Sequence, residues 1–501
     1  MCTLGFEESD YELGLPKSQE DRSNGDTTAA DATFCAKCGQ RDVKLLRKRK
    51  NQYCEVCFLV STTHKFRATL GKSKVVRRDE SVLFGCSGKE NSTVLAHLIK
   101  AAQNESVGKK LPFRCTMLYI DDGAIKGRTD GERRHILYRM ARWAEDCGLT
   151  GYVVPLNKSG NLCEQVRRMD EPYLDNTRED AALRETIDAL ENETAKDEFV
   201  RQLRRKILVS VAQKLECTKV FVADSSIDLA TKVLADISTG RGARLSFDVG
   251  FLDTRSPNVT LLRPLRDFTN EEISGYLSCH GLIPVFDSLK RTRAFPASIR
   301  NVTHNFVSWM DSEFHSATST IYRTGEKLTA RPVLTDSQPS IPTIEDINDV
   351  HPDRENICLL CQVPLDKYNT RDQQLSAVQA KAFSELTSVG KNPFSCSAKN
   401  LVNESTSSKE VQLNKDVENK KCLRDKVSCC TTQCTDSFID GSEVRPILTL
   451  EMLETYLCYG CKLIFSKFNA EPNLLPDFML DGIREKLQFR RMRKEIADFL
   501  I

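Results

Sequence analysis

Cysteine pairs are the residues whose type and spacing most directly indicate chemistry in this sequence. Two thiolates separated by two residues lie on one tight turn, and two such turns complete the four-sulfur tetrahedron that zinc prefers. The first two C-x-x-C pairs are separated by fifteen residues, a spacing typical of zinc ribbons. They predict a structural zinc site with the ligands Cys35, Cys38, Cys54 and Cys57.

A second zinc site is predicted from the two remaining pairs, although about a hundred residues separate them. The entropic cost of closing a loop grows slowly with its length, so a long insertion between two ligand pairs is tolerated. The ligands would be Cys358, Cys361, Cys458 and Cys461. A redox role is less favoured, because we expect none of the pairs to open a helix after a strand as in thioredoxin-like motifs.

The compartment of the protein decides how its 20 cysteines are read. The sequence has no long apolar run and no N-terminal signal segment, so we expect a soluble cytoplasmic protein without membrane association. In a reducing compartment, paired cysteines favour metal over disulfides. The net charge of +2 gives no overall electrostatic signal, so a nucleic-acid surface would have to come from local clusters of Lys and Arg.

A strand, a small-residue turn and a helix follow one another between Ser81 and Lys100. Ser81–Cys86 is a short apolar run that ends at a Ser-Gly turn, and apolar residues then recur at helical spacing. Such turns bind phosphate in α/β folds, because the first N–H groups of the helix lack partners and carry the positive end of its dipole. The stretch predicts a nucleotide-binding loop at Ser87, Gly88 and Ser92.

Strand-like and helix-like segments alternate from Ser81 to about Glu313, which predicts an α/β, doubly wound, mostly parallel sheet. The further strands are expected at Arg114–Ile120, Gly151–Pro155, Val220–Ala223 and Leu261–Leu265. The helices are expected at Glu132–Asp146, in two pieces of Arg178–Glu216 broken near Asn192, at Ser226–Ile237, at Asn270–Cys279 with Thr269 as N-cap, and at Ile483–Leu500.

The composition divides the chain into unequal parts. The expected domains are a disordered tail (1–32), an N-terminal zinc knuckle (33–72), the α/β domain (73–330), a proline-containing linker (331–355), and a C-terminal zinc knuckle with a final helix (356–501). A disordered insertion rich in Ser, Thr, Asn and Lys is expected within the last part, at 391–442. Its five cysteines are expected to be free thiols.

These features together resemble the PP-loop (adenine nucleotide alpha-hydrolase-like) ATP pyrophosphatases, and among them the branch that thiolates tRNA and carries a zinc knuckle at each end. Catalytic members have S-G-G-x-D-S after the first strand, where this chain has Ser87–Ser92, with Lys89 and Asn91 in place of the second Gly and the Asp. Ile120–Gly123 resembles the branch's I-D-E-G stretch. Val222–Asp228 keeps only the last Asp of T-G-H-N-A-D-D.

The thiol positions of the catalytic members are also changed. Their C-x-x-C-G-x-x-R-R segment aligns with Asp197–Val200, followed by Arg204 and Arg205, so neither thiol is present to pass sulfur. A lysine side chain at Lys89 would crowd the approach of phosphates to the backbone. The resemblance therefore implies no catalytic residue in this chain and ATP bound by a partner subunit.

The order of the motifs over residues 35–501 resembles the cytoplasmic tRNA 2-thiolation protein 2 family, the PP-loop-like partner of a catalytic tRNA thiolase. The resemblance implies a heterodimer that 2-thiolates the wobble uridine (mcm5s2U34) of cytosolic tRNAs. Sulfur would arrive as a thiocarboxylate on a ubiquitin-related modifier. The cationic candidates for binding tRNA are Lys48, Arg49, Lys50, Lys72, Arg204 and Arg205.

Two other functions stay open. One is an enzyme that adenylates tRNA and transfers sulfur by itself, using the altered loop. The other is a zinc-containing adaptor for nucleic acid or protein that has no connection with thiolation. For the cationic segments, the alternative to RNA binding is an ordinary solvated surface.

Overall fold

A computed structural model describes most of the α/β region and both cysteine-containing ends of the chain. The described residues are 34–40, 46–48, 51–104, 111, 113–157, 166–171, 177–286, 295–314, 316–328, 357–365, 449–471 and 474–497. The expected tail, linker and insertion lie outside these residues, as do Arg49 and Lys50. The expected domain boundaries stay predictions.

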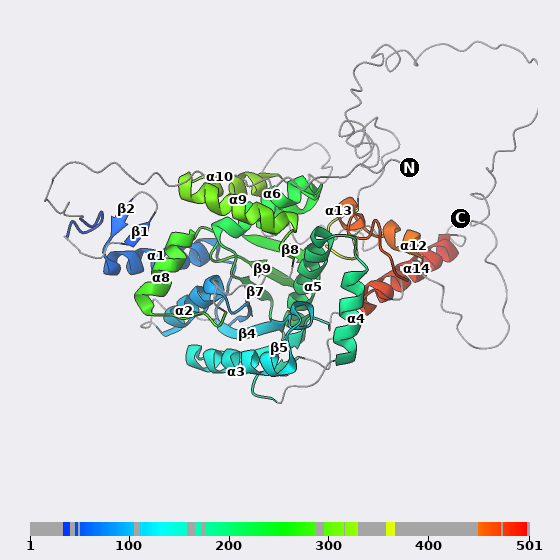
Figure 1. The fold of residues 1–501 in the computed structure, drawn as a ribbon, viewed down its shortest axis with the longest axis horizontal. Coiled ribbons are helices and arrows are strands. Elements are labelled where there is room, and N and C mark those ends of the chain that lie inside the picture. Colours follow the sequence, from blue (N-terminus) through cyan, green and yellow to red (C-terminus); the bar gives the residue numbers. More distant parts are fainter. Residues whose placement is uncertain are drawn as a thin grey trace, which may run out of the picture.

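Among the described residues, a seven-stranded sheet forms the centre of the molecule (Figure 1), in the order β6-β5-β4-β3-β7-β9-β8. The strands are β3 (Ser81–Cys86), β4 (Arg114–Asp121), β5 (Thr150–Pro155), β6 (Arg167–Arg168), β7 (Lys219–Val222), β8 (Leu252–Ser256) and β9 (Val259–Leu262). The inner strands pair in parallel, and the edge strands β6 and β8 pair antiparallel. The expected mostly parallel sheet is confirmed.

Helices cover both faces of this sheet. Successive side chains of β3 accordingly pack in two different hydrophobic clusters, one on each face. Val82 and Phe84 pack with α1 (Glu55–Ser73), α2 (Glu90–Asn104), α3 (Asp130–Cys147) and α8 (Asn270–His280). Leu83 packs on the other side with α4 (Thr177–Asp188), α5 (Glu193–Lys214), α12 (Leu450–Thr455), α13 (Tyr459–Lys462) and α14 (Asp477–Ala497). The doubly wound α/β class is therefore confirmed.

A further group of helices packs together beside β8, at the top of the view in Figure 1. It consists of α6 (Ser226–Ser238), α7 (Leu245–Val249), α9 (Ile299–Glu313) and α10 (Ala317–Lys327). None of these helices, nor any other that the structure describes, combines the length and apolar character needed to span a membrane.

Local signals locate several element boundaries correctly. The break near Asn192 is confirmed, since its side chain accepts a hydrogen bond from Ala195 N at 2.9 Å and begins α5. Thr269 forms the expected capping box with Glu272. The sequence prediction omits β8, which turns into β9 through Pro257 and Asn258. The signal was this Pro-Asn dipeptide, whose Asn has a φ of 63°.

A buried ion network joins the second half of the α/β region to the last part of the chain. Its carboxylates are Glu198, Asp236, Asp248 and Asp253, and its guanidinium groups are those of Arg201, Arg205, Arg244 and Arg255. Arg205 Nε lies 3.1 Å from Asp253, and Arg255 Nη2 lies 2.7 Å from the same carboxylate. The network thus links α5, α6, α7 and β8.

Charge pairing, rather than solvation, stabilises the ionised groups of this network. Burial alone would raise the pKa of Asp253, but Arg255 and Arg205 outweigh burial and hold it well below the ordinary carboxyl value. Burial likewise opposes ionisation of Glu198, and the charges of Arg201 and Arg244 lower its pKa to about 2. Removing one partner from such a site leaves an uncompensated buried charge.

We predict that Asp253→Asn lowers the free energy of unfolding by about 3–5 kcal/mol, because Arg205 and Arg255 lose a shared carboxylate in the interior. A depressed pKa contributes stability that is complete above the ordinary carboxyl pKa of about 4 and is lost as the pH falls below it. The acid destabilisation of the wild-type chain should therefore shrink in the variant. Urea unfolding at pH 7 and at pH 3 measures both effects.

The matched control is Asp170→Asn. Asp170 pairs with Arg168 at 3.2 Å, and both side chains are more than half exposed, so its loss should cost less than about 1 kcal/mol. Equal losses for the two variants would contradict the structural role assigned to the buried network.

Candidate functional site

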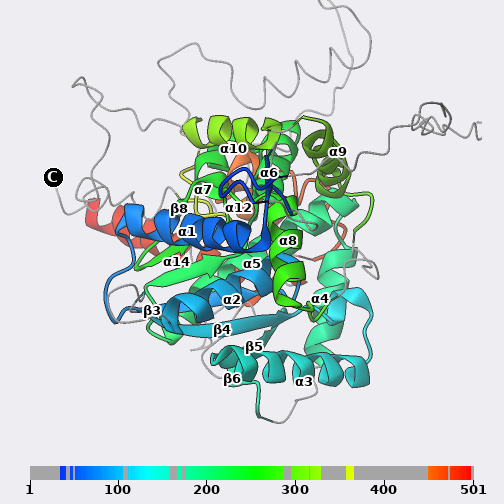
Figure 2. The ribbon, with the colours of Figure 1, turned by 90° about the vertical axis from the view of Figure 1, so that its left-hand side faces the viewer.

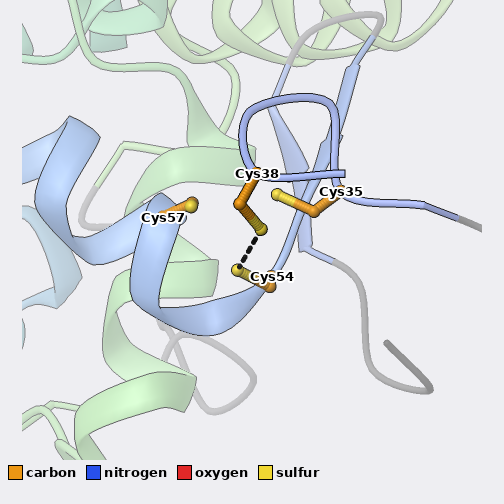
Figure 3. A group of neighbouring side chains, drawn as sticks. All are labelled: Cys35, Cys38, Cys54 and Cys57. Carbon is orange, nitrogen blue, oxygen red and sulfur yellow. Dashed lines mark hydrogen bonds between the residues drawn. The ribbon is translucent and has the colours of Figure 1, made fainter. Parts of the chain in front are cut away.

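The first cysteine cluster gathers four thiols between a loop and the start of α1, as Figure 3 shows. The sulfur atoms of Cys35, Cys38, Cys54 and Cys57 all lie within 4.8 Å of one another. Cys35 and Cys38 come from the loop, and Cys54 is the N-cap of α1, directly after a hairpin of β1 (Leu46–Lys48) and β2 (Asn51–Tyr53). The structure thus brings together the four predicted ligands.

Neighbouring groups shift the pKa values of two of these thiols in opposite directions. The N–H of Lys37 donates to Cys35 Sγ at 3.5 Å. Hydrogen bonds from backbone groups, that of Cys38 first, lower the pKa of Cys35 to about 6, whereas the bond to Cys54 raises that of Cys57 to about 12. Because zinc is bound by thiolates, a shared cation would favour the ionised form of these ligands.

The second cluster forms although its pairs are far apart in the sequence. Cys358, Cys361, Cys458 and Cys461 place their sulfur atoms within 4.8 Å of one another, and all but Cys458 are buried. Arg205 Nη1 donates to Gln362 Oε1 at 2.8 Å, and Arg255 Nη1 donates to the carbonyl of Cys361 at 3.3 Å. The buried ion network therefore holds this cluster against the α/β region.

Both clusters fit zinc by their donors and their spacing. Tetrahedral zinc with Zn–S bonds of about 2.3 Å separates its sulfur ligands by about 3.8 Å. Cys38 and Cys54 Sγ are 3.8 Å apart, and Cys361 and Cys458 Sγ are 3.5 Å apart. The zinc assignment stays a prediction, supported by this geometry.

One premise of the sequence reasoning is wrong. No pair was expected to open a helix after a strand, yet Cys54 and Cys57 open α1 directly after β2. The physical difference from a redox motif is the second pair, Cys35 and Cys38, which faces them and completes a four-sulfur set.

The predicted nucleotide-binding loop joins β3 to α2, and its side chains are occupied internally. Gly88 has a φ of 71°, and a Cβ there would meet the Phe286 ring at 2.7 Å. Ser87 Oγ donates to Ser92 Oγ at 3.3 Å, and Ser92 Oγ donates to the carbonyl of Lys89 at 2.8 Å. Binding a phosphate through these hydroxyls would require breaking their present bonds.

Asn91 connects this loop to the N-terminal end of α6. Its Nδ2 donates to Asp228 Oδ2 at 2.7 Å, and the same carboxylate accepts the backbone N–H of Ser225 at 3.0 Å at the start of α6. The acidic residue that the sequence retains therefore caps a helix and binds an amide.

A cationic cavity of about 280 Å³ lies at the carboxyl ends of β3, β4 and β7. The strand order reverses between β3 and β7, the position where α/β sheets bind ligands. Among the described residues, nine Lys or Arg and four Asp side chains line it, including Lys89, Lys126 and Arg263. The cavity could therefore accept an anion. The sequence reasoning missed Arg263, for which no local signal exists.

Contacts fill the segment that aligns with the missing thiols. Asp197 Oδ2 accepts a hydrogen bond from Ser298 Oγ at 3.2 Å, and Val200 is buried. The ring of Phe199 packs edge-on against Phe465, with the centroids 5.8 Å apart. The segment therefore packs against the end of the chain.

The predicted tRNA-binding cations occupy different environments. Lys72 is exposed on α1, whereas Lys48 lies in β1. Arg204 is 41% exposed and pairs with Asp122 at 2.8 Å. Arg205 is only 12% exposed and belongs to the buried ion network, where Asp253 compensates its charge. We keep the RNA proposal for Lys72 and Arg204 and assign Arg205 a structural role.

We predict that Cys54→Ser removes one of two bound zinc ions per chain and destabilises the first cluster, because structural zinc supplies folding free energy. Elemental analysis of the purified chain gives the metal content, and thermal unfolding gives the stability. Cys279→Ser is the control, since Cys279 belongs to neither cluster and should leave two zinc ions in place. An unchanged metal content in the Cys54 variant would refute the four-ligand assignment.

Among solved structures, the chain is similar to the U34-tRNA thiolase NcsA from Methanococcus maripaludis with its [4Fe-4S] cluster. The TM-score is 0.45 at 20% sequence identity, over 59% of this chain and 87% of that chain.

Sequence comparisons identify the family. The family model described as cytoplasmic tRNA 2-thiolation protein 2 matches residues 298–463. The chain is 29% identical over 510 residues to the Danio rerio protein of that name, covering 93% of this chain and 94% of the relative. It is 31% identical over 356 residues to the Drosophila erecta protein, covering 70% and 81%. These names agree with the expected cytoplasmic location, and the chain belongs to the cytoplasmic tRNA 2-thiolation protein 2 family.

Proposed function

We propose that this chain is a non-catalytic, tRNA-binding subunit of a complex that 2-thiolates the wobble uridine of cytosolic tRNAs. In this proposal a catalytic PP-loop partner binds ATP and activates the uridine. The same partner takes sulfur from a thiocarboxylated ubiquitin-related modifier. The two cysteine clusters would hold structural zinc in the present chain.

The internal occupation of the loop between β3 and α2 is the observation that carries this proposal. Ser87 and Ser92 bond to each other, and Asn91 bonds to Asp228, so the polar side chains of the loop are already engaged within the fold. Adenylation would also need a way to neutralise the pyrophosphate as it leaves. Where the catalytic sequence has glycine this chain has Lys89, whose side chain would crowd the approach of phosphates to the backbone.

The contacts of Asp197–Val200 give independent support. Sulfur transfer needs thiolates that can reach both the donor and the activated base. At positions 197 and 200 this chain has a carboxylate bonded to Ser298 and a buried valine. A partner would therefore have to supply the sulfur-transferring cysteines.

A second function is favoured by one observation, the cationic cavity at the carboxyl ends of the strands. Nine cations around about 280 Å³ could bind the phosphates of a nucleotide, which would make the chain an adenylating enzyme by itself. The four Asp side chains neutralise part of that charge. Lys232, for example, lies 2.6 Å from Asp224.

We expect the purified chain to release no pyrophosphate when it is incubated with ATP, Mg²⁺ and tRNA, because its loop lacks the second glycine and the Asp. Calorimetric titration with ATP and a coupled pyrophosphate assay measure binding and turnover separately. Micromolar ATP binding together with pyrophosphate release would favour the second function. The double variant Lys89→Gly/Asn91→Asp, which restores the catalytic pattern, tests whether the loop alone limits activity.

Removing the protein from cells should abolish 2-thiouridine at the wobble position, since the catalytic partner would lose its tRNA-binding subunit. Mass spectrometry of nucleosides from purified tRNA quantifies the modified base. Re-expression of the wild-type chain should restore it, and so should the Asp170→Asn control. Normal 2-thiouridine without the protein would remove thiolation from its function and favour a zinc-containing adaptor.

A further inference from the structure

An open groove of about 1310 Å³ lies between α1 and α10, away from the cavity at the strand ends. Figure 2 shows both helices on the face turned to the viewer, with α1 in blue below α10. Phe251, Asp267 and Tyr53 of β2 also line the groove. Tyr53 directly precedes Cys54, so the groove lies next to the first cysteine cluster.

One face of α1 forms a complete wall of this groove. Its lining residues recur every three or four positions from Ser61 to Ser73, which places them in a single stripe along the helix. At a rise of about 1.5 Å per residue, this stripe is about 18 Å long. A ligand that fills it must be elongated. The small side chains of Ser61 and Ala68 leave room for it close to the helix.

The charge of the groove is strongly positive. Five Lys or Arg side chains and two carboxylates line it. Both carboxylates are paired within the fold, because Glu326 binds Arg266 at 2.9 Å and Asp267 binds Arg323 at 3.2 Å. These pairs neutralise Arg266 and Arg323, so the excess positive charge of the groove comes from its lysines.

Lys72 and Lys327 carry the charge that remains for a ligand. They stand on opposite walls, near the C-terminal ends of α1 and α10, and both are exposed. In the part of the chain that the structure describes, neither has a carboxylate within ion-pair distance. Exposed cations on both walls of one groove favour an anionic ligand.

We propose that this groove binds the sugar-phosphate backbone of RNA, with Lys72 and Lys327 each contacting a phosphate. The inference rests on the proposed function, which supplies tRNA as the polyanion. An elongated cationic groove matches a chain of evenly spaced phosphates, and lysine contacts give affinity that depends on salt but little on sequence. The aromatic ring of Tyr53 at one end offers a surface on which an unpaired base can stack.

The test compares tRNA binding by the full-length wild-type chain and by Lys72→Glu/Lys327→Glu. The probe is an unmodified tRNA transcript with a wobble uridine, followed by fluorescence anisotropy at several salt concentrations. We expect the affinity to fall at least about tenfold near 0.1 M salt. The slope of log affinity against log salt should decrease by about 1.5, because each phosphate contact contributes roughly 0.7–0.9.

The control is Arg134→Glu/Arg139→Glu, which makes the same charge change at two exposed positions of α3. It should keep more than half of the wild-type affinity. The milder pair Lys72→Gln/Lys327→Gln should show the same loss of slope, and its thermal unfolding midpoint should match that of the wild type.

Three results would contradict the proposal that the groove binds RNA. They are an unchanged affinity and slope in both lysine pairs, an equal loss in the α3 control, or retained tRNA affinity with loss of binding to the thiolase partner. The last would assign the groove to an acidic protein surface. Each of these leaves the proposed function standing, since that function is judged by cellular 2-thiouridine and not by the groove.

Discussion

The buried ion network is the interaction on which the arrangement of this molecule depends. It connects α5, α6, α7 and β8 through charged side chains that are largely buried. Arg205 and Arg255 extend it to the second cysteine cluster. Such networks are seldom more stabilising than apolar packing, but their directional bonds tolerate few alternative arrangements. The network thus fixes where the end of the chain docks against the sheet, which a cluster of Leu and Phe side chains would specify less narrowly.

Glu198 shows how this docking relates to the missing chemistry. It lies between the two positions where the resembled catalytic members carry thiols, and it pairs with Arg244 at 2.6 Å. Phe199, its neighbour, packs on Phe465. A segment that must present reactive sulfur needs room and access. Here Phe199 of the same segment packs against the final part of the chain, which supports the proposal that a partner supplies the sulfur-transferring thiols.

Features that depend on neighbouring residues could be predicted from the sequence, and features that depend on distant partners could not. The strand Ser81–Cys86 and the cap at Thr269 follow from local pattern, and the cysteine pairs follow from metal geometry. The ion pair of Arg205 could not be predicted, because its sequence neighbours are basic and only the fold brings Asp253 to it. The groove could not be predicted from the sequence either, since most of the α/β region separates Lys72 from Lys327 along the chain.

A nearly neutral chain can still carry local clusters of positive charge on its surface. The net charge of +2 averages over 72 basic and 70 acidic residues, and the interior ion network consumes several of each. Acidic and basic groups that pair in the interior cancel one another, whereas Lys72 and Lys327 are exposed at the surface. The potential that a phosphate meets is set by such unpaired positions within a Debye length of about 8 Å. The positions of the exposed cations, rather than the net charge of the chain, would therefore decide where RNA binds.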